Sequence, residues 1–182
     1  MNSGIKMARG DIIGILNADD YYPANDVLSH VVEVFEDPTV EACYGDLVYV
    51  DSQDTDKITR YWKAGSFDRR KVYWGWMPPH PTFFVRSDVY KKYGLFNLDL
   101  GSAADYEIML RFMLKHQINV AYIPQVLVHM RTGGLSNASL SNRLAANRND
   151  RKAWEVNGLK PYPWTLTMKP LRKIGQWVFI KP

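Results

Sequence analysis

Two adjacent carboxylates follow an apolar stretch near the beginning of the chain. The apolar stretch is residues 12–16, and Asn17, Asp19 and Asp20 come directly after it. Neighbouring carboxylates repel each other, so such a pair is tolerated where a cation or a hydroxyl-rich ligand occupies the site. Oxygen ligands favour Mg²⁺ or Mn²⁺, which complete their shell with phosphate oxygens and water. The residues therefore predict a divalent-metal site for a phosphorylated ligand. The alternative is a polar turn that caps the following helix.

The elements that must position these side chains follow from the spacing of apolar residues. Residues 11–17 are typical of a buried strand. Further strands are expected over 40–50, 58–65, 82–86, 118–123 and 126–130, and helices over 26–36, 87–94, 104–116 and most of the last forty residues. This alternation predicts an α/β fold. Ligands in such sheets bind beyond the carboxyl ends of the strands, which is where the acidic cluster is expected.

Composition limits the class of protein. The chain has 182 residues and is 46% apolar, which is enough for one hydrophobic core. It has no run of eighteen or more apolar residues, and its first residues lack the apolar core of a signal peptide. The single cysteine, Cys43, excludes an internal disulfide framework and a zinc site built from cysteines. We expect Cys43 in the core, and a reducing cytosol fits this usage.

Charge is unevenly distributed along the chain. From Arg143 onward, nine Lys and Arg residues stand against two acids, whereas residues 1–142 carry a net charge of about −3. Aromatic residues interrupt this basic segment at Trp154, Trp164, Trp177 and Phe179. Such a pattern suits an anionic membrane surface or a nucleic acid. The alternative is a solubilising helix whose aromatic residues pack on the body.

Four motifs occur in an order that is specific to one enzyme family. The first motif combines residues 2–4, residues 8–11 and the acidic cluster at 17–20. The other three are "HPTFFVRSDVYKKYGLFN" at 80–97, "SAADYEIMLRF" at 102–112 and "VHMRTGGLSN" at 128–137. In this order they resemble family 2 glycosyltransferases, which are inverting enzymes that use nucleotide-sugar donors. The resemblance covers roughly residues 1–140. It implies a GT-A-like fold, that of nucleotide-diphospho-sugar transferases, in which helices flank a mixed sheet.

The resemblance also implies a mechanism. Inverting transfer is a single displacement that needs a base on the acceptor hydroxyl and charge neutralisation on the leaving diphosphate, which a divalent cation, Mn²⁺ or Mg²⁺, supplies. By resemblance Asp20 is the metal ligand, whereas Asp19 and Asn17 hold ribose or sugar hydroxyls or ligate the metal through water. Asp105 is the catalytic base. Taken without the resemblance, Asp105 is an ordinary acid at a helix N-terminus, where the macrodipole favours it.

Further residues have candidate roles beside a structural alternative. Glu107 and Arg111 lie four apart on one helix face, so we expect them to pair and to support Asp105 on the acceptor side. His129 is a candidate metal ligand or diphosphate contact, and Arg131 a candidate donor contact through the diphosphate. For both, a structural role is an equal alternative.

An aromatic loop is the candidate sugar platform. Trp74, Trp76 and His80 lie in "WGWMPPHP" at residues 74–81. Aromatic faces stack on the apolar faces of pyranose rings. The alternative is an aromatic loop packed into the core.

Two departures from the family pattern matter. Asn17 stands where many relatives have Asp, which removes one anionic ligand. The family's first strand, with a "P-x-Y-N"-like end, and the βαβ segment that holds the nucleotide base do not precede Met1, and that unit takes about 30 residues or more. We therefore expect an N-terminally truncated GT-A domain over residues 1–140, followed by a basic, aromatic, helical extension over 141–182.

The predicted function is transfer of a sugar from a nucleotide-diphosphate donor to a saccharide or lipid-linked acceptor in cell-surface polysaccharide synthesis. The alternatives are a catalytically inactive remnant and a metal-dependent phosphate-processing enzyme. No nucleic-acid motif supports a nucleic-acid partner.

The expected location is cytoplasmic, with peripheral contact at the inner face of the cell membrane. Acceptors in this family are often lipid-linked. Residues 164–182 carry basic residues and apolar anchors that can lie in an anionic membrane interface without spanning it: Lys169, Arg172, Lys173, Trp177, Phe179 and Lys181. Pro170 is expected to interrupt a long helix there.

Overall fold

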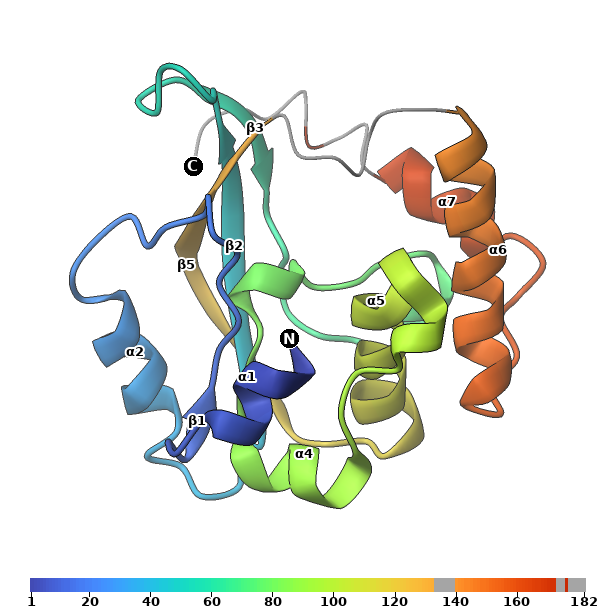
Figure 1. The fold of residues 1–182 in the computed structure, drawn as a ribbon, viewed down its shortest axis with the longest axis horizontal. Coiled ribbons are helices and arrows are strands. Elements are labelled where there is room, and N and C mark those ends of the chain that lie inside the picture. Colours follow the sequence, from blue (N-terminus) through green and yellow to red (C-terminus); the bar gives the residue numbers. More distant parts are fainter. Residues whose placement is uncertain (133–139, 173–175, 177–182) are drawn as a thin grey trace.

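A mixed five-stranded sheet organises the molecule, and helices cover both of its faces (Figure 1). The computed structural model describes residues 1–132, 140–172 and 176. The strands are β1 (Ile12–Ile13), β2 (Ala42–Val50), β3 (Ile58–Trp62), β4 (Phe84–Arg86) and β5 (Val120–Arg131). The helices are α1 (Asn2–Met7), α2 (Val27–Val34), α3 (Arg69–Tyr73), α4 (Ser87–Tyr93), α5 (Ala104–Met109), α6 (Leu140–Val156) and α7 (Thr165–Arg172). Two 3₁₀ turns, η1 (His80–Thr82) and η2 (Leu98–Ala103), precede β4 and α5, and a π-helical segment, η3 (Leu110–Lys115), continues α5.

Strand β2 is the centre of the sheet. It pairs antiparallel with β4 through its first residues and with β3 through its last ones. On its other side it pairs in parallel with β5. Strand β1 joins the sheet through an antiparallel pairing with β4. The carboxyl ends of β2 and β5 therefore lie at the same edge of the sheet.

Each face of the sheet has its own hydrophobic cluster. On one face, Val27, Val31 and Phe35 of the α2 segment pack against Cys43, Leu47 and other sheet residues. On the opposite face, α5 and η3 provide the larger cluster around the buried Tyr44 and Val85. Figure 1 shows α2 on one side of the sheet and α5, α6 and α7 on the other. The expected mixed α/β fold with flanking helices is confirmed, and Cys43 lies in the core as expected.

The first predicted strand is much shorter than expected. The expected strand covered residues 11–17, whereas β1 is Ile12–Ile13, paired with Arg86 and Val85. At Gly14 the ring of Phe84 lies so close that a Cβ atom would come within 2.4 Å of it. The chain therefore leaves the sheet after Ile13, and the acidic cluster is carried by a loop rather than by a strand end.

The last two predicted strands are one strand. Strand β5 runs through Pro124, and its pairing with β2 jumps from Gly45–Ile123 to Asp46–Val126. Proline has no N–H to donate to a ladder, so residues 124 and 125 bulge out without ending the strand.

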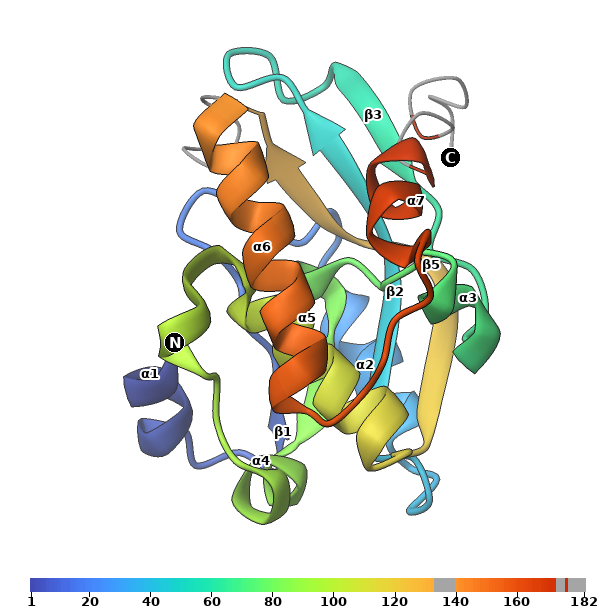
Figure 2. The same ribbon diagram turned by 90° about the vertical axis from the view of Figure 1, so that its right-hand side faces the viewer.

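Two short helices, α1 and α3, were not predicted, whereas the C-terminal helices were. Helices α6 and α7 lie on either side of the expected proline-rich break at 161–163. Pro170 does not end α7, which continues to Arg172. Figure 2 shows α6 lying across α5. Within the described residues, no helix is both long and apolar enough to cross a bilayer.

Candidate functional site

The acidic turn, residues 17–21, reaches the carboxyl end of β5 through a short backbone bridge. The Tyr21 N–H donates to the His129 carbonyl at 3.0 Å, and the His129 N–H donates to the Tyr21 carbonyl at 2.8 Å. The rings of the two residues meet edge to face, with centroids 5.2 Å apart. Tertiary contact with β5, rather than the end of β1, therefore places the acidic turn at the carboxyl edge of the sheet.

Asp20 is the buried member of the acidic turn, whereas Asn17 and Asp19 are exposed. Its side chain is 7% exposed, and Oδ2 accepts a bond of 2.8 Å from Asn17 Nδ2. Burial raises the pKa of Asp20, and repulsion from Asp19 acts in the same direction. The Asn17 amide and the nearby backbone N–H of Arg131 partly offset this rise in pKa. The carboxylate is thus held in a place that disfavours its charge.

Asp20 Oδ1 is the feature of this turn that fits a metal ligand. It is buried and has no hydrogen-bond partner among the described residues. A buried carboxylate oxygen without a partner is costly unless a ligand completes it. The described residues contain no group of three or more His, Cys, Asp or Glu side chains that could hold a metal. A cation that takes one or two protein carboxylates and fills the rest of its shell from a bound diphosphate and water would satisfy Asp20 Oδ1.

The backbone of His129 and Arg131, on β5, lies beside the acidic turn. The His129 Nδ1 atom lies 3.2 Å from the Tyr21 hydroxyl, and burial lowers the pKa of this histidine. The imidazole is therefore neutral at pH 7, the state in which it binds metals. The exposed Arg131 guanidinium lies 5.9 Å from the Tyr21 ring centroid. The structure thus brings the segment that carries the predicted diphosphate residues next to the acidic turn.

A second cation, not predicted from the sequence, lies near the carboxyl end of β2. Arg60 of β3 lies over the ring of Tyr49, 4.5 Å from its centroid, and donates to Gln176. Burial raises the pKa of the Tyr49 hydroxyl, the charge of Arg60 opposes this rise and the charge of Asp20 adds to it, so Tyr49 lies near the acidic turn. The pairing of β2 with β3 creates this arrangement, and no local sequence motif signals it.

Asp105 lies at the beginning of α5, beside His80 of η1. Its Oδ1 atom accepts a bond of 2.7 Å from the Tyr106 backbone N–H. Burial lowers the pKa of His80, and the charge of Asp105 opposes this effect. The predicted base and one member of the predicted sugar platform are therefore neighbours, although they are 25 residues apart in the sequence.

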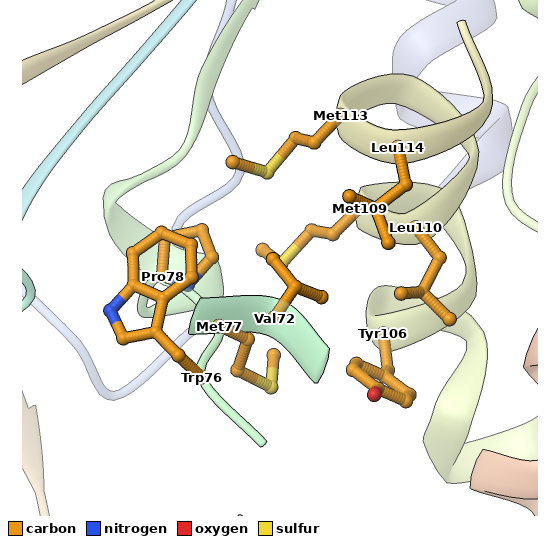
Figure 3. A pocket seen from close by; sticks show the side chains of 9 residues that line it. All are labelled: Val72, Trp76, Met77, Pro78, Tyr106, Met109, Leu110, Met113 and Leu114. Atoms are coloured by element: carbon orange, nitrogen blue, oxygen red, sulfur yellow. The ribbon is translucent and has the colours of Figure 1, made fainter. Parts of the chain in front are cut away.

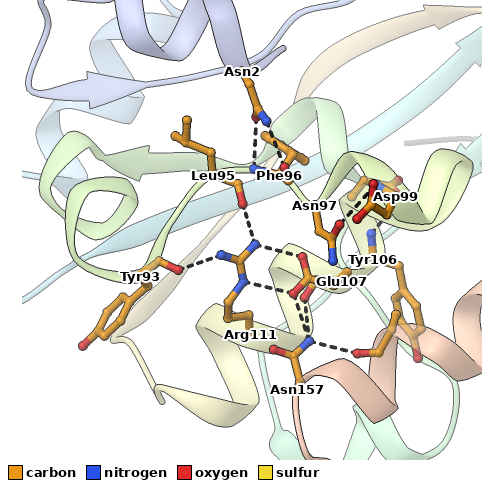
Figure 4. A network of polar contacts seen from close by, with 12 residues as sticks. Asn2, Tyr93, Leu95, Phe96, Asn97, Asp99, Tyr106, Glu107, Arg111 and Asn157 are labelled. Carbon is orange, nitrogen blue, oxygen red and sulfur yellow. Dashed lines mark hydrogen bonds and ion pairs between the residues drawn. The ribbon is translucent and has the colours of Figure 1, made fainter.

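Glu107 and Arg111 form the expected pair, and it is part of a larger buried network (Figure 4). Arg111 contacts both carboxylate oxygens, at 3.0 and 2.8 Å, and donates to the carbonyls of Tyr93 and Leu95. Asn157 of the segment after α6 donates to Glu107 Oε1 at 3.1 Å. Glu107 is 3% exposed. Both Glu107 carboxylate oxygens are bonded to these partners. Glu107 is therefore suited to supporting α5 and not to contacting the acceptor directly.

The C-terminal helices clamp the residue that follows Asp105. Trp154 Nε1 donates to the Tyr106 hydroxyl at 2.9 Å. On α7, the Lys169 ammonium lies 3.5 Å from the Tyr106 ring centroid and bonds Asp150 at 2.7 Å. We call α5 with these partners from α6 and α7 the clamped helix. Its polar contacts hold the backbone that presents Asp105.

Trp76 is buried in the core and does not present an open face. It is 5% exposed, and its Nε1 atom donates to the Ala64 carbonyl at 2.8 Å. It lines a small apolar pocket with Tyr106 and residues of α5 and η3 (Figure 3). The pocket volume of about 10 Å³ holds no more than one water molecule and no sugar. Trp74 is exposed, on the outside of the same loop.

Asp46 is a buried acid that the sequence reading did not single out. Its carboxylate accepts bonds from the Tyr61 and Tyr122 hydroxyls, at 2.5 and 2.8 Å, and from the Ala64 N–H. Burial and this carboxylate raise the pKa of Tyr122 to about 12. An acid inside the apolar run of residues 40–50 was the available signal. All its bonds tie β2 to neighbouring segments, so its role is structural.

Some predicted features lie outside the described residues. They are the end of the motif at 128–137, from residue 133 onward, and the proposed membrane anchors Lys173, Trp177, Phe179 and Lys181.

The chain is similar to known glycosyltransferases. The model of glycosyl transferase family 2 matches residues 1–94. The fold is similar to that of the mannosyltransferase PcManGT from Pyrobaculum calidifontis, solved in complex with GDP-Man and Mn²⁺, with a TM-score of 0.53 and 16% identity. This likeness covers 92% of the chain and 46% of the mannosyltransferase, so the chain spans about half the length of that protein. A comparison with curated proteins finds no match.

These comparisons confirm the family and the fold that the motifs implied. The structural likeness, at 16% identity, supports the GT-A-like fold alone. The family match is independent of it and includes the acidic turn. Because that match covers residues 1–94 of a chain of 182 residues, the chain belongs to glycosyl transferase family 2.

Proposed function

We propose that the protein transfers a sugar, with inversion, from a nucleotide-diphosphate donor to a saccharide or lipid-linked acceptor in cell-surface polysaccharide synthesis. The observation that carries this proposal is the buried Asp20 carboxylate, whose Oδ1 atom has no partner among the described residues. It lies beside the backbone N–H of Arg131 at the carboxyl edge of the sheet. A divalent cation would complete the coordination of Asp20 Oδ1, and a diphosphate would accept hydrogen bonds from the Arg131 guanidinium.

The donor is held on this edge. Arg131 contacts the diphosphate, and Asn17 and Asp19, both exposed in the acidic turn, hold sugar or ribose hydroxyls. Asp20, with His129 as a second candidate ligand, holds the divalent cation, Mn²⁺ or Mg²⁺. When bound, that cation stabilises the charge that develops on the leaving diphosphate. The complex of the similar mannosyltransferase with GDP-Man and Mn²⁺ makes this pair the first donor and cation to test.

The acceptor is activated on the side of the clamped helix. Asp105 accepts the proton of the acceptor hydroxyl. At the same time the acceptor oxygen attacks the anomeric carbon, and the bond from that carbon to the diphosphate breaks. His80, kept neutral by burial beside Asp105, can donate a hydrogen bond to the acceptor or to the base. Glu107 supports this base through the buried network with Arg111. A positioned base contributes about 10²–10⁴ in rate.

Calorimetry and a transfer assay together test the proposal. We expect GDP-mannose or another nucleotide sugar to bind in the presence of Mn²⁺, and Asp20→Asn to lose this binding. Asp105→Asn should bind the donor normally and lose transfer by at least about 10²-fold. Asp99→Asn is the matched control, because Asp99 is exposed in the turn before α5.

Two results would contradict the proposal. Equal donor binding by Asp20→Asn and wild type would remove Asp20 from the donor site. Wild type that binds none of the nucleotide sugars would favour an inactive protein, since the chain spans about half of the similar mannosyltransferase.

A further inference from the structure

Two segments far apart in the sequence form an exposed aromatic surface. Trp74, at the end of α3, contacts Trp164, at the beginning of α7, with ring centroids 5.6 Å apart. Tyr162 contacts Trp164 at 5.1 Å, and Tyr73 at 5.0 Å. Trp74, Tyr162 and Trp164 are 47%, 48% and 43% exposed. We call these three residues the aromatic patch.

The patch is held rigidly by backbone contacts. The Thr165 hydroxyl donates to the Tyr73 carbonyl at 2.6 Å. Gly75 packs against the backbone of α7 so closely that a Cβ atom would lie 2.4 Å from the Lys169 nitrogen. Three large rings in fixed positions lose little conformational freedom when they bind a partner.

Helix α7 extends the patch with a second apolar face. Its buried side carries Thr165 and Leu166. Trp164, Met168 and Leu171 recur at spacings of four and three residues on the opposite side, and Leu171 is 53% exposed. A helix that packs through one face and exposes a second apolar stripe is not explained by the core alone.

Basic residues lie next to the residues of this surface in the sequence. Arg70 and Lys71 lie four and three residues before Trp74, on the same side of that helical turn. Exposed Lys160 precedes Tyr162, and exposed Arg172 follows Leu171. Arg70 is paired with Asp68, so the other three residues provide the excess charge. Tryptophan and tyrosine rings next to basic side chains are typical of contact with an anionic membrane interface.

We infer that the aromatic patch and the exposed face of α7 bind an anionic membrane surface. The inference deepens the proposed function, because it rests on that function for the lipid-linked acceptor that such contact would serve. It also changes the membrane contact expected from residues 164–182, since two of the three patch residues, Trp74 and Tyr162, lie outside that segment. The binding itself requires neither donor nor acceptor, so the two proposals fail separately.

Co-sedimentation of the full chain with lipid vesicles tests the inference. We expect binding to phosphatidylcholine vesicles that contain phosphatidylglycerol, little binding to phosphatidylcholine alone, and weaker binding at high salt. Trp74→Ser/Trp164→Ser should reduce the partition coefficient at least tenfold. The matched control is Leu28→Ser/Val32→Ser, which removes two comparably exposed apolar residues, 49% and 54%, from α2 on the opposite side of the sheet.

A charge variant keeps the test valid if removal of the rings disturbs folding. Lys160→Glu/Arg172→Glu leaves the aromatic contacts intact and should also reduce binding at least tenfold. Lys91→Glu/Lys92→Glu on α4 changes net charge equally and should not. Equal loss in both charge variants, or unchanged binding by the tryptophan variant, would overturn the inference. Dimerisation through Trp74 and Trp164 without lipid would also overturn it and assign the surface to a second copy.

Discussion

The acidic turn and the clamped helix present their carboxylates in opposite ways. In the acidic turn, Asp20 is buried with one oxygen that has no partner among the described residues. In the clamped helix, Glu107 is equally buried, but Arg111 and Asn157 bond its carboxylate. A buried charge without full compensation costs stability, whereas a compensated network holds a segment in place. The difference distinguishes the carboxylate that we propose binds a ligand from carboxylates that position a neighbouring segment.

The largest expected loss of stability comes from removing a charge in the clamped helix. Glu107→Gln leaves the Arg111 guanidinium buried without its counter-charge, and we expect a loss of about 3–5 kcal/mol in the free energy of unfolding. Urea denaturation measures it. Asp88→Asn is the control: it removes the exposed partner of Lys91 on α4, and no measurable change is expected. Similar small losses in both variants would show that the network does not hold the helix.

A smaller effect is expected where α7 meets the aromatic loop. Gly75 has φ +77° and Gly65 has φ +69°, but a Cβ atom at Gly65 meets nothing within 4 Å. Both alanine variants strain the backbone, whereas Gly75→Ala also pushes the backbone around Lys169, a partner of Tyr106. We expect Gly75→Ala to lower the free energy of unfolding by about 1–3 kcal/mol more than Gly65→Ala. Equal losses of stability in the two variants would mean that α7 shifts at little cost and does not hold α5 in place.

The smallest effect on stability is expected in the acidic turn, and its sign is the informative part. The pKa of Asp20 is raised in the folded protein, so its contribution to stability is present at pH values below the usual carboxyl pKa. That contribution is lost as the pH rises through the folded pKa. Asp20→Asn should therefore be as stable as wild type or more stable at pH 7, although it loses the donor.

Thermal unfolding of wild type and Asp20→Asn between pH 3 and pH 7 measures this effect. The stability of wild type relative to the variant should fall as the pH rises. A variant clearly less stable than wild type at pH 7 would show that Asp20 has a structural role like that of Glu107.

Local patterns in the sequence determined the element types and the family. The apolar run at 40–50 predicted β2, the runs at 118–123 and 126–130 predicted the two parts of β5 as separate strands, and Pro23 to Asp26 before an apolar helix pattern predicted α2. The spacing of Glu107 and Arg111 predicted their pair, because residues four apart on a helix face each other whatever surrounds them. The four motifs indicated the family, and the family match over residues 1–94 includes the first motif and most of the second.

Tertiary structure alone decided which residues of different elements lie in contact. Residues 14–17 read as strand, but the Phe84 ring beside Gly14 and the bridge from Tyr21 to His129 carry that segment off the sheet to the end of β5. The burial of Trp76, the clamp on Tyr106 and the pairing of Trp74 with Trp164 likewise join segments distant in sequence. Periodicity reports which face of one element is apolar, whereas contacts between elements depend on how complete surfaces pack, and no single segment contains that information.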